Sequence, residues 1–430
     1  MEVNSNNTVQ KKNYVLPIII MFALFFMIAF VTGYQNPLGS VIEKKTAGNA
    51  FMSQLPTFAN FIAYAFMGIP AGIILQRRGY RITALLAVTL GFAGVLISFL
   101  SGAAFGENVA VYLVGAFVSG FSMCLLNTVV NPMLNSLGSD DKKGNQLVQF
   151  GGTCNSLGAT LAPAVVGYLM GNQANAIADA NPVFYMAMII FALAFVVLFV
   201  SKLPESPTLG QKQEKVDMAG AFKYSNFTFG VLAIFIYMGI EIGVANFSLQ
   251  YMTKGVGISM STAGALVGMY WLLMLVGRLT GGIVGGKVSS RVMLTVVSSL
   301  VIIFLVLAIC LPQSMQIPFI GIESSPTFKI VEQVVPVSAM LLLLCGLGTS
   351  VMWGAIFNLS VSGLGKYTQV ASGIFMVMVC GGGILPLIQS SIIGDSTSPE
   401  VFLSSYWLVV AFAAYELFYA LVGSRVSKKS

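Results

Sequence analysis

Histidine is absent from this chain of 430 residues, and charged residues make up only 9% of it. Soluble domains carry about 25% charged residues, so this composition argues against a soluble protein. Without histidine, the chain lacks the commonest switchable acid or base and the commonest metal ligand. The five cysteines lie in or at the ends of apolar segments, without the spacing of a metal site or a disulfide framework. The sequence therefore argues against an enzyme and against a bound metal or other cofactor.

Long apolar runs dominate the chain, which is 57% hydrophobic. A helix needs about 20 apolar residues to cross a hydrocarbon core of roughly 30 Å. Twelve candidate runs lie at 14–40, 51–75, 82–101, 109–136, 145–170, 183–203, 227–252, 262–286, 292–312, 331–361, 370–394 and 400–424. The first run is too long for a signal peptide and has no cleavage site after it, so we interpret it as a span. The sequence predicts an all-α membrane protein with twelve transmembrane helices and the lipid bilayer as its surroundings.

The net charge of +7 follows a membrane topology. If both termini are cytoplasmic, 17 of the 22 basic residues lie in inside loops, four lie in outside loops, and Arg278 lies within a span. Lysine and arginine are enriched in cytoplasmic loops of membrane proteins. We therefore expect both termini in the cytoplasm, and we attribute the basic excess to topology and not to a nucleic-acid partner.

The longest polar inside segment, 203–226, falls between the sixth and seventh spans. It divides the chain into an N-terminal six-helix half, 1–202, and a C-terminal six-helix half, 227–430. Weak self-similarity relates the two: an offset of 210 places Asn36 on Asn246, and an offset of 227 places Asn131 on Asn358. The 17 additional residues fit in the predicted outside loop at 312–329. Transporters built from such repeats bind their substrate where the repeats meet.

Amides within the spans gather on the first, fourth, fifth, seventh and tenth spans. Asn127, Asn131 and Asn135 recur every four residues, so they share one face of a helix. An amide both donates and accepts hydrogen bonds, as a sugar hydroxyl requires, which favours a polar cavity for a neutral sugar. The alternative is that the amides join neighbouring helices. Candidate substrate-binding residues are Gln35, Asn36, Asn127, Asn131, Gln149, Asn155, Glu241, Asn246, Gln250, Trp353 and Asn358.

Three ionisable residues lie inside predicted spans, where burial of charge is costly enough to suggest a function. Glu241 is roughly 21 Å from the inner end of the seventh span, close to the middle of the bilayer, and is the candidate for coupling transport to an ion. Arg278 and Glu416 are each roughly 12 Å from the inner ends of their spans. Their equal depth allows an ion pair between them.

Several motifs resemble one transporter family over nearly the whole chain. "LNTVVNPMLNSLG" (126–138) is similar to that family's "LETAANP...LG", "TCNSLG" (153–158) to its "TFNSFG", and "YMGIEIGVANFS" (237–248) to its "YVGxE". The sequence resembles the fucose/glucose/galactose permease branch of the major facilitator superfamily. This resemblance implies a sugar permease of a bacterial inner membrane that works by alternating access between two pseudo-symmetric halves.

The loop between the second and third spans resembles the gating signature of that superfamily. In "GIILQRRGYR" the matching residues are Gly72, Arg77, Gly79 and Arg81, and Gln76 stands where the signature has an acid. Two further departures affect coupling, because Asn36 and Asn127 stand where the proton-coupled fucose permeases carry acids. Proton symport through Glu241, sodium coupling and facilitated diffusion therefore all stay open. We expect a monomer.

Two other functions are alternatives to sugar transport. Efflux of amphipathic small molecules is the alternative within the same fold, but such transporters typically have more apolar pockets than an amide-rich cavity. A membrane enzyme or channel is the alternative outside it, but the sequence offers no pair of nucleophile and base and no ring of charges.

Overall fold

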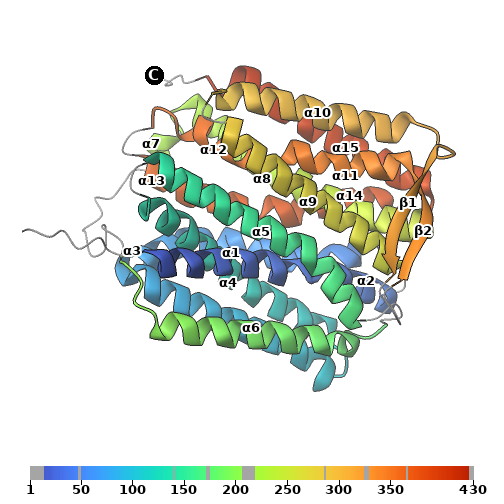
Figure 1. Cartoon of the computed structure of the whole chain (residues 1–430), viewed down its shortest axis with the longest axis horizontal. Helices are drawn as coiled ribbons and strands as arrows, with labels where there is room; N and C mark the ends of the chain where they lie inside the picture. The colour runs from blue at the N-terminus through green and yellow to red at the C-terminus, as the bar shows by residue number, and fades with distance from the viewer. Residues whose placement is uncertain are drawn as a thin grey trace, which may run out of the picture.

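The structure is a computed structural model that describes residues 14–46, 50–138, 141–170, 175–205, 218–284, 287–323, 329–364 and 367–425. Long helices lie side by side in one bundle, with the first half of the chain in the lower part of Figure 1 and the second half above it. Backbone polar groups have no water to bond in a bilayer, so a spanning segment satisfies them within its own helix. This architecture confirms the predicted all-α membrane fold.

The first half of the chain supplies six spans. Its helices are α1 (Val15–Gly33), α2 (Gln35–Lys45), α3 (Ala50–Ala103), α4 (Val109–Ser136), α5 (Asp141–Met170), a short 3-10 helix η1 (Ile177–Ala180) and α6 (Asn181–Val200). The first span is α1 continued by α2, and α3 contains the second and third spans.

The second half supplies the other six. Its elements are α7 (Met218–Ala221), α8 (Ser225–Gln250), the π-helical turn η2 (Tyr251–Gly255), α9 (Met260–Val284), α10 (Ser290–Cys310), β1 (Gln316–Glu323), β2 (Lys329–Pro336), α11 (Val337–Thr349), α12 (Met352–Val361), α13 (Thr368–Met378), α14 (Gly381–Ile393), α15 (Pro399–Phe418) and η4 (Tyr419–Gly423). The tenth span is α11 with α12, and the eleventh is α13 with α14.

Burial differs among the spans. In α4, 56% of the most apolar window is buried, and in α8 with η2 the share is 61%. The corresponding share is 28% in α6 and in α10, and 39% in the last span. In the major facilitator arrangement that the sequence resembles, spans one, four, seven and ten line a central cavity and spans three, six, nine and twelve face lipid. The values for spans one, four, seven, ten, six, nine and twelve agree with this, although the eleventh span, at 56%, is as buried as the central ones and the eighth, at 28%, is as exposed as the peripheral ones.

An unpredicted β-hairpin precedes the tenth span. β1 pairs antiparallel with β2, from Gln316 opposite Pro336 to Glu323 opposite Lys329. The predicted start of the tenth span at residue 331 is therefore wrong, since the helix begins at Val337. The segment "IVEQVVP" is apolar enough to extend a span in a hydropathy reading, but valine and isoleucine favour strands.

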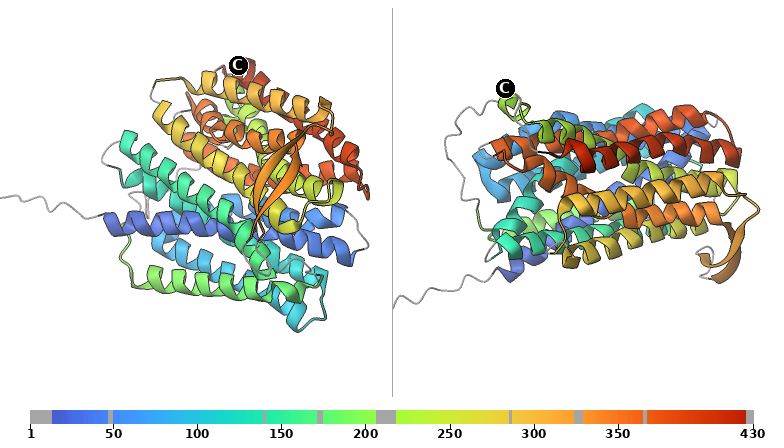
Figure 2. Two further views of the ribbon diagram at one scale, coloured as in Figure 1. Left: turned by 45° about the vertical axis from the view of Figure 1, so that its right-hand side comes forward. Right: turned by 90° about the horizontal axis from the view of Figure 1, so that it is seen from above.

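The hairpin marks one end of the bundle, which we call the hairpin end. At the opposite end, which we call the linker end, α1 begins and η4 finishes (Figures 1 and 2). Both described termini of the chain therefore lie at the same end, as an even number of spans requires.

Gly79 breaks α3 at the linker end, in the predicted gating loop. Its φ of 78° is a conformation that side chains with a Cβ rarely adopt, and a Cβ there would lie 2.1 Å from Glu205 Oε2. The same Glu205 carboxylate accepts a hydrogen bond from the Tyr80 N–H at 2.9 Å. Arg81 donates to the carbonyls of Leu198 and Phe199 at the end of α6. The loop is therefore held against the end of the sixth span.

The other two residues of that loop motif have looser surroundings. Arg77 is exposed. A Cβ added at Gly72 would meet nothing within 4 Å. Their role in gating stays a prediction.

Small residues let α4 pack closely against α3. A Cβ on Gly115 would lie 2.3 Å from Ser98 Oγ and 2.6 Å from the Gly94 carbonyl oxygen. A Cβ on Gly120 would lie 2.1 Å from the carbonyl oxygen of Asn60. Close backbone approach of this kind is a usual basis of helix association in membranes.

Glu107 ties three connections together at the hairpin end. Its carboxylate accepts hydrogen bonds from the backbone N–H groups of Ile177, at 2.5 Å, and Ala178, at 3.0 Å, and pairs with Lys45 at 3.1 Å. Partial burial alone would raise the pKa of Glu107, but these hydrogen bonds and the lysine outweigh it and lower that pKa below its usual value of 4.5. The ion pair lies wholly within the first half of the chain.

We predict that Gly115→Val lowers the stability of the purified protein by about 1–3 kcal/mol, because its side chain has no room between α3 and α4. Gly167→Val is the matched control, since a Cβ at Gly167 would meet nothing within 4 Å. Melting temperature in detergent is the measurement, and an equal loss in both variants would contradict the packing argument.

We predict that Glu107→Gln lowers the melting temperature at neutral pH and that this difference shrinks as the pH falls below 4.5. A carboxyl with a lowered folded-state pKa stabilises the fold above its unfolded pKa and loses that contribution as the pH falls through its folded pKa. Melting curves of both proteins across this pH range are the measurement. A difference independent of pH would show that ionised Glu107 is not the stabilising form.

Candidate functional site

The asparagine stripe on α4 is partly open. Asn127 and Asn131 are half-buried and Asn135 is exposed. The Asn127 amide donates to Tyr64 Oη at 3.0 Å and to the Met123 carbonyl at 3.1 Å, and the Asn131 amide donates to the Asn127 carbonyl at 2.9 Å. Among the described residues, the two side-chain amide oxygens accept no hydrogen bond. They are therefore acceptors available to a ligand that donates, such as a sugar hydroxyl.

Glu241 lies on α8 and is held by two tyrosines. Tyr237, one turn earlier, donates its hydroxyl to Glu241 Oε2. Tyr270 on α9 donates to the Glu241 backbone carbonyl at 3.1 Å and also bonds to Thr349 Oγ1 at 3.1 Å. The residues from 242 to 252 are buried, whereas Glu241 is half-buried. Residues 236–240 are buried as well, so Glu241 is a half-buried residue within an otherwise buried stretch of α8.

Trp353 contacts this group from α12. The centroid of its ring lies 6.2 Å from that of Tyr237, with the two planes tilted by 58°. Trp353 is half-buried and Asn358, further along the same helix, is exposed. An indole beside a carboxylate and a tyrosine offers an apolar face to a ligand whose hydroxyls bond to the polar groups.

Arg278 crosses from one half of the chain to the other. Its Nη1 donates to the Gly152 carbonyl at 3.1 Å and to Ser156 Oγ at 3.0 Å, which joins α9 to α5. Glu241 is close enough for its charge to interact with that of Arg278. Arg278 is half-buried, and a charge within a membrane protein is expensive unless other groups compensate it.

The ion pair considered between Arg278 and Glu416 does not form in this structure. Arg278 is engaged with α5, as described above. Glu416 on α15 is fully buried, and neither of its carboxylate oxygens has a hydrogen-bond partner among the described residues.

Two predicted binding residues instead join neighbouring helices. Gln35 is buried and its Oε1 accepts a hydrogen bond from the Tyr112 hydroxyl at 2.6 Å. Asn155 donates to the Phe25 carbonyl at 3.0 Å and so ties α5 to α1. Both contacts match the interhelical alternative. The side chains of Asn36 and Gln149 lie outside the described part of the structure, so their binding roles stay predictions.

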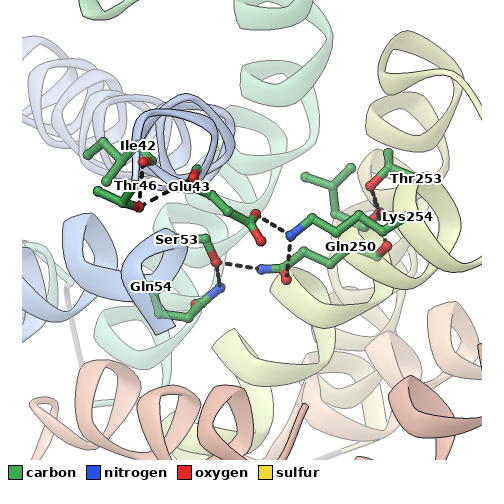
Figure 3. A network of polar contacts seen from close by, with 9 residues as sticks. Ile42, Glu43, Thr46, Ser53, Gln54, Gln250, Thr253 and Lys254 are labelled. Carbon is green, nitrogen blue, oxygen red and sulfur yellow. Dashed lines mark hydrogen bonds and ion pairs between the residues drawn. The ribbon is translucent and has the colours of Figure 1, made fainter. Parts of the chain in front are cut away.

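Asn246 and Gln250 lie in a polar network between the two halves of the chain, at the hairpin end. Figure 3 shows the part of this network around Gln250. The Asn246 amide donates to Gln54 Oε1 at 3.0 Å, and the Gln250 amide donates to Ser53 Oγ at 3.0 Å. Both side chains are buried. In this conformation they bond to protein groups, and their predicted contact with a substrate is untested.

Lys254 extends this network to Glu43, with which it forms an ion pair. Sequence reasoning missed both residues as functional candidates, because they were assigned to an outside loop. A signal was present, since Asn246, Gln250 and Lys254 recur every four residues on one helix face. The polar stripe on the seventh span thus faces the other half of the chain.

Exposure of the central helices differs between the two ends of the bundle. Toward the hairpin end, α8 is buried continuously over residues 242–250. Toward the linker end, residues 131–132 and 135–136 of α4 and residues 357–359 of α12 are half-buried or exposed. These stretches of α4 and α12 toward the linker end are therefore less buried than the end of α8 that lies toward the hairpin end.

The sequence matches a known protein family. The family model described as Major Facilitator Superfamily matches residues 21–386. The chain belongs to the major facilitator superfamily. The proteins of this superfamily are membrane transporters, which accords with a polar site at the centre of a helical bundle.

Several similar proteins are named as sugar transporters. The glucose/galactose transporter of Brucella abortus (strain 2308) is 26% identical over 97% of this chain and 96% of that protein. The L-fucose-proton symporter of Escherichia coli is 23% identical over 87% of this chain and 86% of that protein.

Solved structures support the superfamily fold. A crystal structure of the Escherichia coli fucose:proton symporter superposes with a TM-score of 0.64 at 18% identity, covering 94% of this chain and 99% of that one. A D-xylose-proton symporter superposes with a TM-score of 0.66 at 14% identity, covering 97% and 98%.

We predict that Glu241 and Arg278 stabilise each other in this superfamily protein. Glu241→Gln and Arg278→Gln should each lower the stability, and the double variant should lose about 1 kcal/mol less than the sum of the single losses. Unfolding of the four proteins in detergent, analysed as a double-mutant cycle, is the measurement. Additive losses would mean that the two charges do not interact.

Proposed function

We propose that the chain is a secondary transporter that moves a neutral monosaccharide, such as a hexose or fucose, across a bacterial inner membrane by alternating access. The observation that carries the proposal is the pair of half-buried amides on α4 whose oxygens accept no hydrogen bond among the described residues, together with the Glu241, Tyr237 and Trp353 group. Each hydrogen bond to a sugar hydroxyl contributes about 0.5–1.5 kcal/mol, so selective recognition needs several at once. The sugars in the names of the similar transporters support this substrate class.

Binding would occur where the two six-helix halves, 1–202 and 227–430, meet. The segment 203–226 would link them at the cytoplasmic face. The basic residues of the inside loops support this orientation, as does the position of both described termini at one end (Figure 1). The hairpin end would then face outward, and the protein would act as a monomer.

Glu241 is the residue that would couple sugar movement to a proton or sodium ion. A carboxylate can bind either ion, whereas the amides of Asn36 and Asn127 cannot titrate. The tyrosine hydroxyl that donates to Glu241 can respond to its ionisation, and Arg278 supplies a counter-charge when Glu241 is ionised. An efflux role for amphipathic molecules is less well supported, because the accessible groups on α4 are amides and not an apolar surface.

The prediction is that proteoliposomes accumulate one or more of labelled fucose, glucose, galactose, mannose and N-acetylhexosamines when a proton or sodium gradient is imposed. Glu241→Gln should abolish gradient-driven accumulation and keep sugar exchange, because the neutral side chain fixes one ionisation state. Glu416→Gln is the matched control, as it removes a second buried carboxyl away from the described site.

Uptake of no sugar by the wild-type protein would overturn the proposed function. Accumulation that survives in Glu241→Gln would overturn the coupling role alone. Lipophilic cations tested in the same vesicles would identify the efflux alternative.

A further inference from the structure

Hydrogen bonds between the two halves of the chain are concentrated in two places within the described residues. One is the contact of Arg278 with α5 near the middle of the bundle. The other is the network at the hairpin end, where α2 and the beginning of α3 face the end of α8 and η2 (Figure 3). The second group closes the hairpin end, so its residues decide whether a path can open there.

The network is continuous from the bundle end inward. Lys254 pairs with Glu43 and also donates to Gln250 Oε1 at 3.5 Å, and Gln250 in turn donates to Ser53 at 3.0 Å. Gln54 donates to the same Ser53 hydroxyl at 3.3 Å. We call the chain of bonds that joins Glu43, Lys254, Gln250, Ser53, Gln54 and Asn246 the ladder.

The ladder is shielded from water. Gln54 is 1% exposed and Gln250 is 3% exposed. The side chain of Glu43 is 6% exposed, against 24% for that of Lys254. Buried polar groups are stable only while they are paired, so the ladder stabilises the conformation in which the halves touch at this end.

Lys254 reaches Glu43 from a π-helical turn. In η2 the chain leaves the regular α-helical pattern after Gln250, and the Lys254 side chain extends across to α2 (Figure 3). Single π-helical turns within helices often occur at functional sites. Lys254 therefore forms the ion pair from a turn that is not regular α-helix.

We propose that Glu43 and Lys254, together with the ladder, form a gate at the hairpin end of the substrate path. This inference rests on the proposed transport function. Rocking of one half against the other separates α2 from η2 and must break the ion pair and the amide contacts together. The gate is closed in this structure, and substrate enters or leaves at the hairpin end only after it opens.

The chain contains a matched control for this gate. Lys45 and Glu107 also form an ion pair at the hairpin end, at 3.1 Å, with side chains that are 25% and 23% exposed. Both belong to the first half, so movement between the halves leaves them together. Loss of this second pair should affect stability without favouring an open gate.

The first test fixes the gate with a cross-link. Glu43→Cys with Lys254→Cys is treated with a short thiol-specific cross-linker that a reducing agent removes, and sugar uptake is measured before treatment, after it and after reduction. The control is Lys45→Cys with Glu107→Cys, and the single-cysteine variants correct for the five native cysteines. Reversible loss of uptake only in the 43/254 variant is expected. Undiminished uptake by the fully cross-linked 43/254 variant would overturn the gate.

The second test needs no sugar, so it separates the gate from the proposed function. Thr57→Cys places a thiol at the inner end of the ladder, where Thr57 accepts from the Asn246 amide at 3.5 Å. A membrane-impermeant maleimide is added to vesicles from the hairpin end. Lys254→Gln should accelerate labelling roughly tenfold, which corresponds to about 1.4 kcal/mol, and Lys45→Gln should leave the rate unchanged.

A charge-reversed pair completes this test. Glu43→Lys with Lys254→Glu should return the labelling rate close to that of the parent protein, because the attraction is restored with opposite sign. Equal rates in the parent protein and in Lys254→Gln would overturn the proposal. Folding of every variant is checked by size-exclusion profile and melting temperature.

Discussion

The constraint on which this structure depends is that a bilayer offers no water to unpaired polar groups. Backbone groups meet it by forming helices, and side chains meet it by bonding to one another or by facing an accessible interior. Glu241, with Tyr237 and Arg278 around it, and the ladder at the hairpin end are two outcomes of this constraint. The Glu241 group keeps polar atoms available to a ligand, and the ladder joins the two halves of the chain.

Glu241 and two residues of the ladder, Asn246 and Gln250, lie on the same helix, α8. Asn246 and Gln250 are engaged with the other half, whereas Glu241 is half-buried within the same buried stretch of the helix. A rigid movement of α8 therefore changes the surroundings of Asn246 and Gln250 and of Glu241 together. This shared helix links access at one end of the bundle to the electrostatic environment at its centre.

Hydropathy and charge in the sequence were sufficient to predict the membrane spans and the polar stripe on α4. Each of the twelve runs contains a helical span, although the tenth run begins in strand β2, and Asn127 and Asn131 do form one stripe. The sequence could not predict which side chains contact one another. Gln35 could not be distinguished from a substrate-binding amide without knowing its contact with Tyr112, and Glu43 fell in a predicted loop. The hairpin was missed because residues 331–336 satisfy a hydropathy criterion and a strand preference equally well. Amide composition does not reveal whether an amide faces a ligand or a neighbouring helix.

Asparagine at position 127, with its amide committed to Tyr64 and its own helix, also has a consequence for energy conversion. A transporter whose central helices offer one deep carboxylate would carry at most one coupling ion through that group in each cycle. One elementary charge moving through 100 mV supplies about 2.3 kcal/mol, enough for a sugar gradient of roughly 50-fold. Organisms that use such a protein would meet a lower ceiling on accumulation than two coupled ions allow, and would spend less of their ion gradient on each sugar molecule.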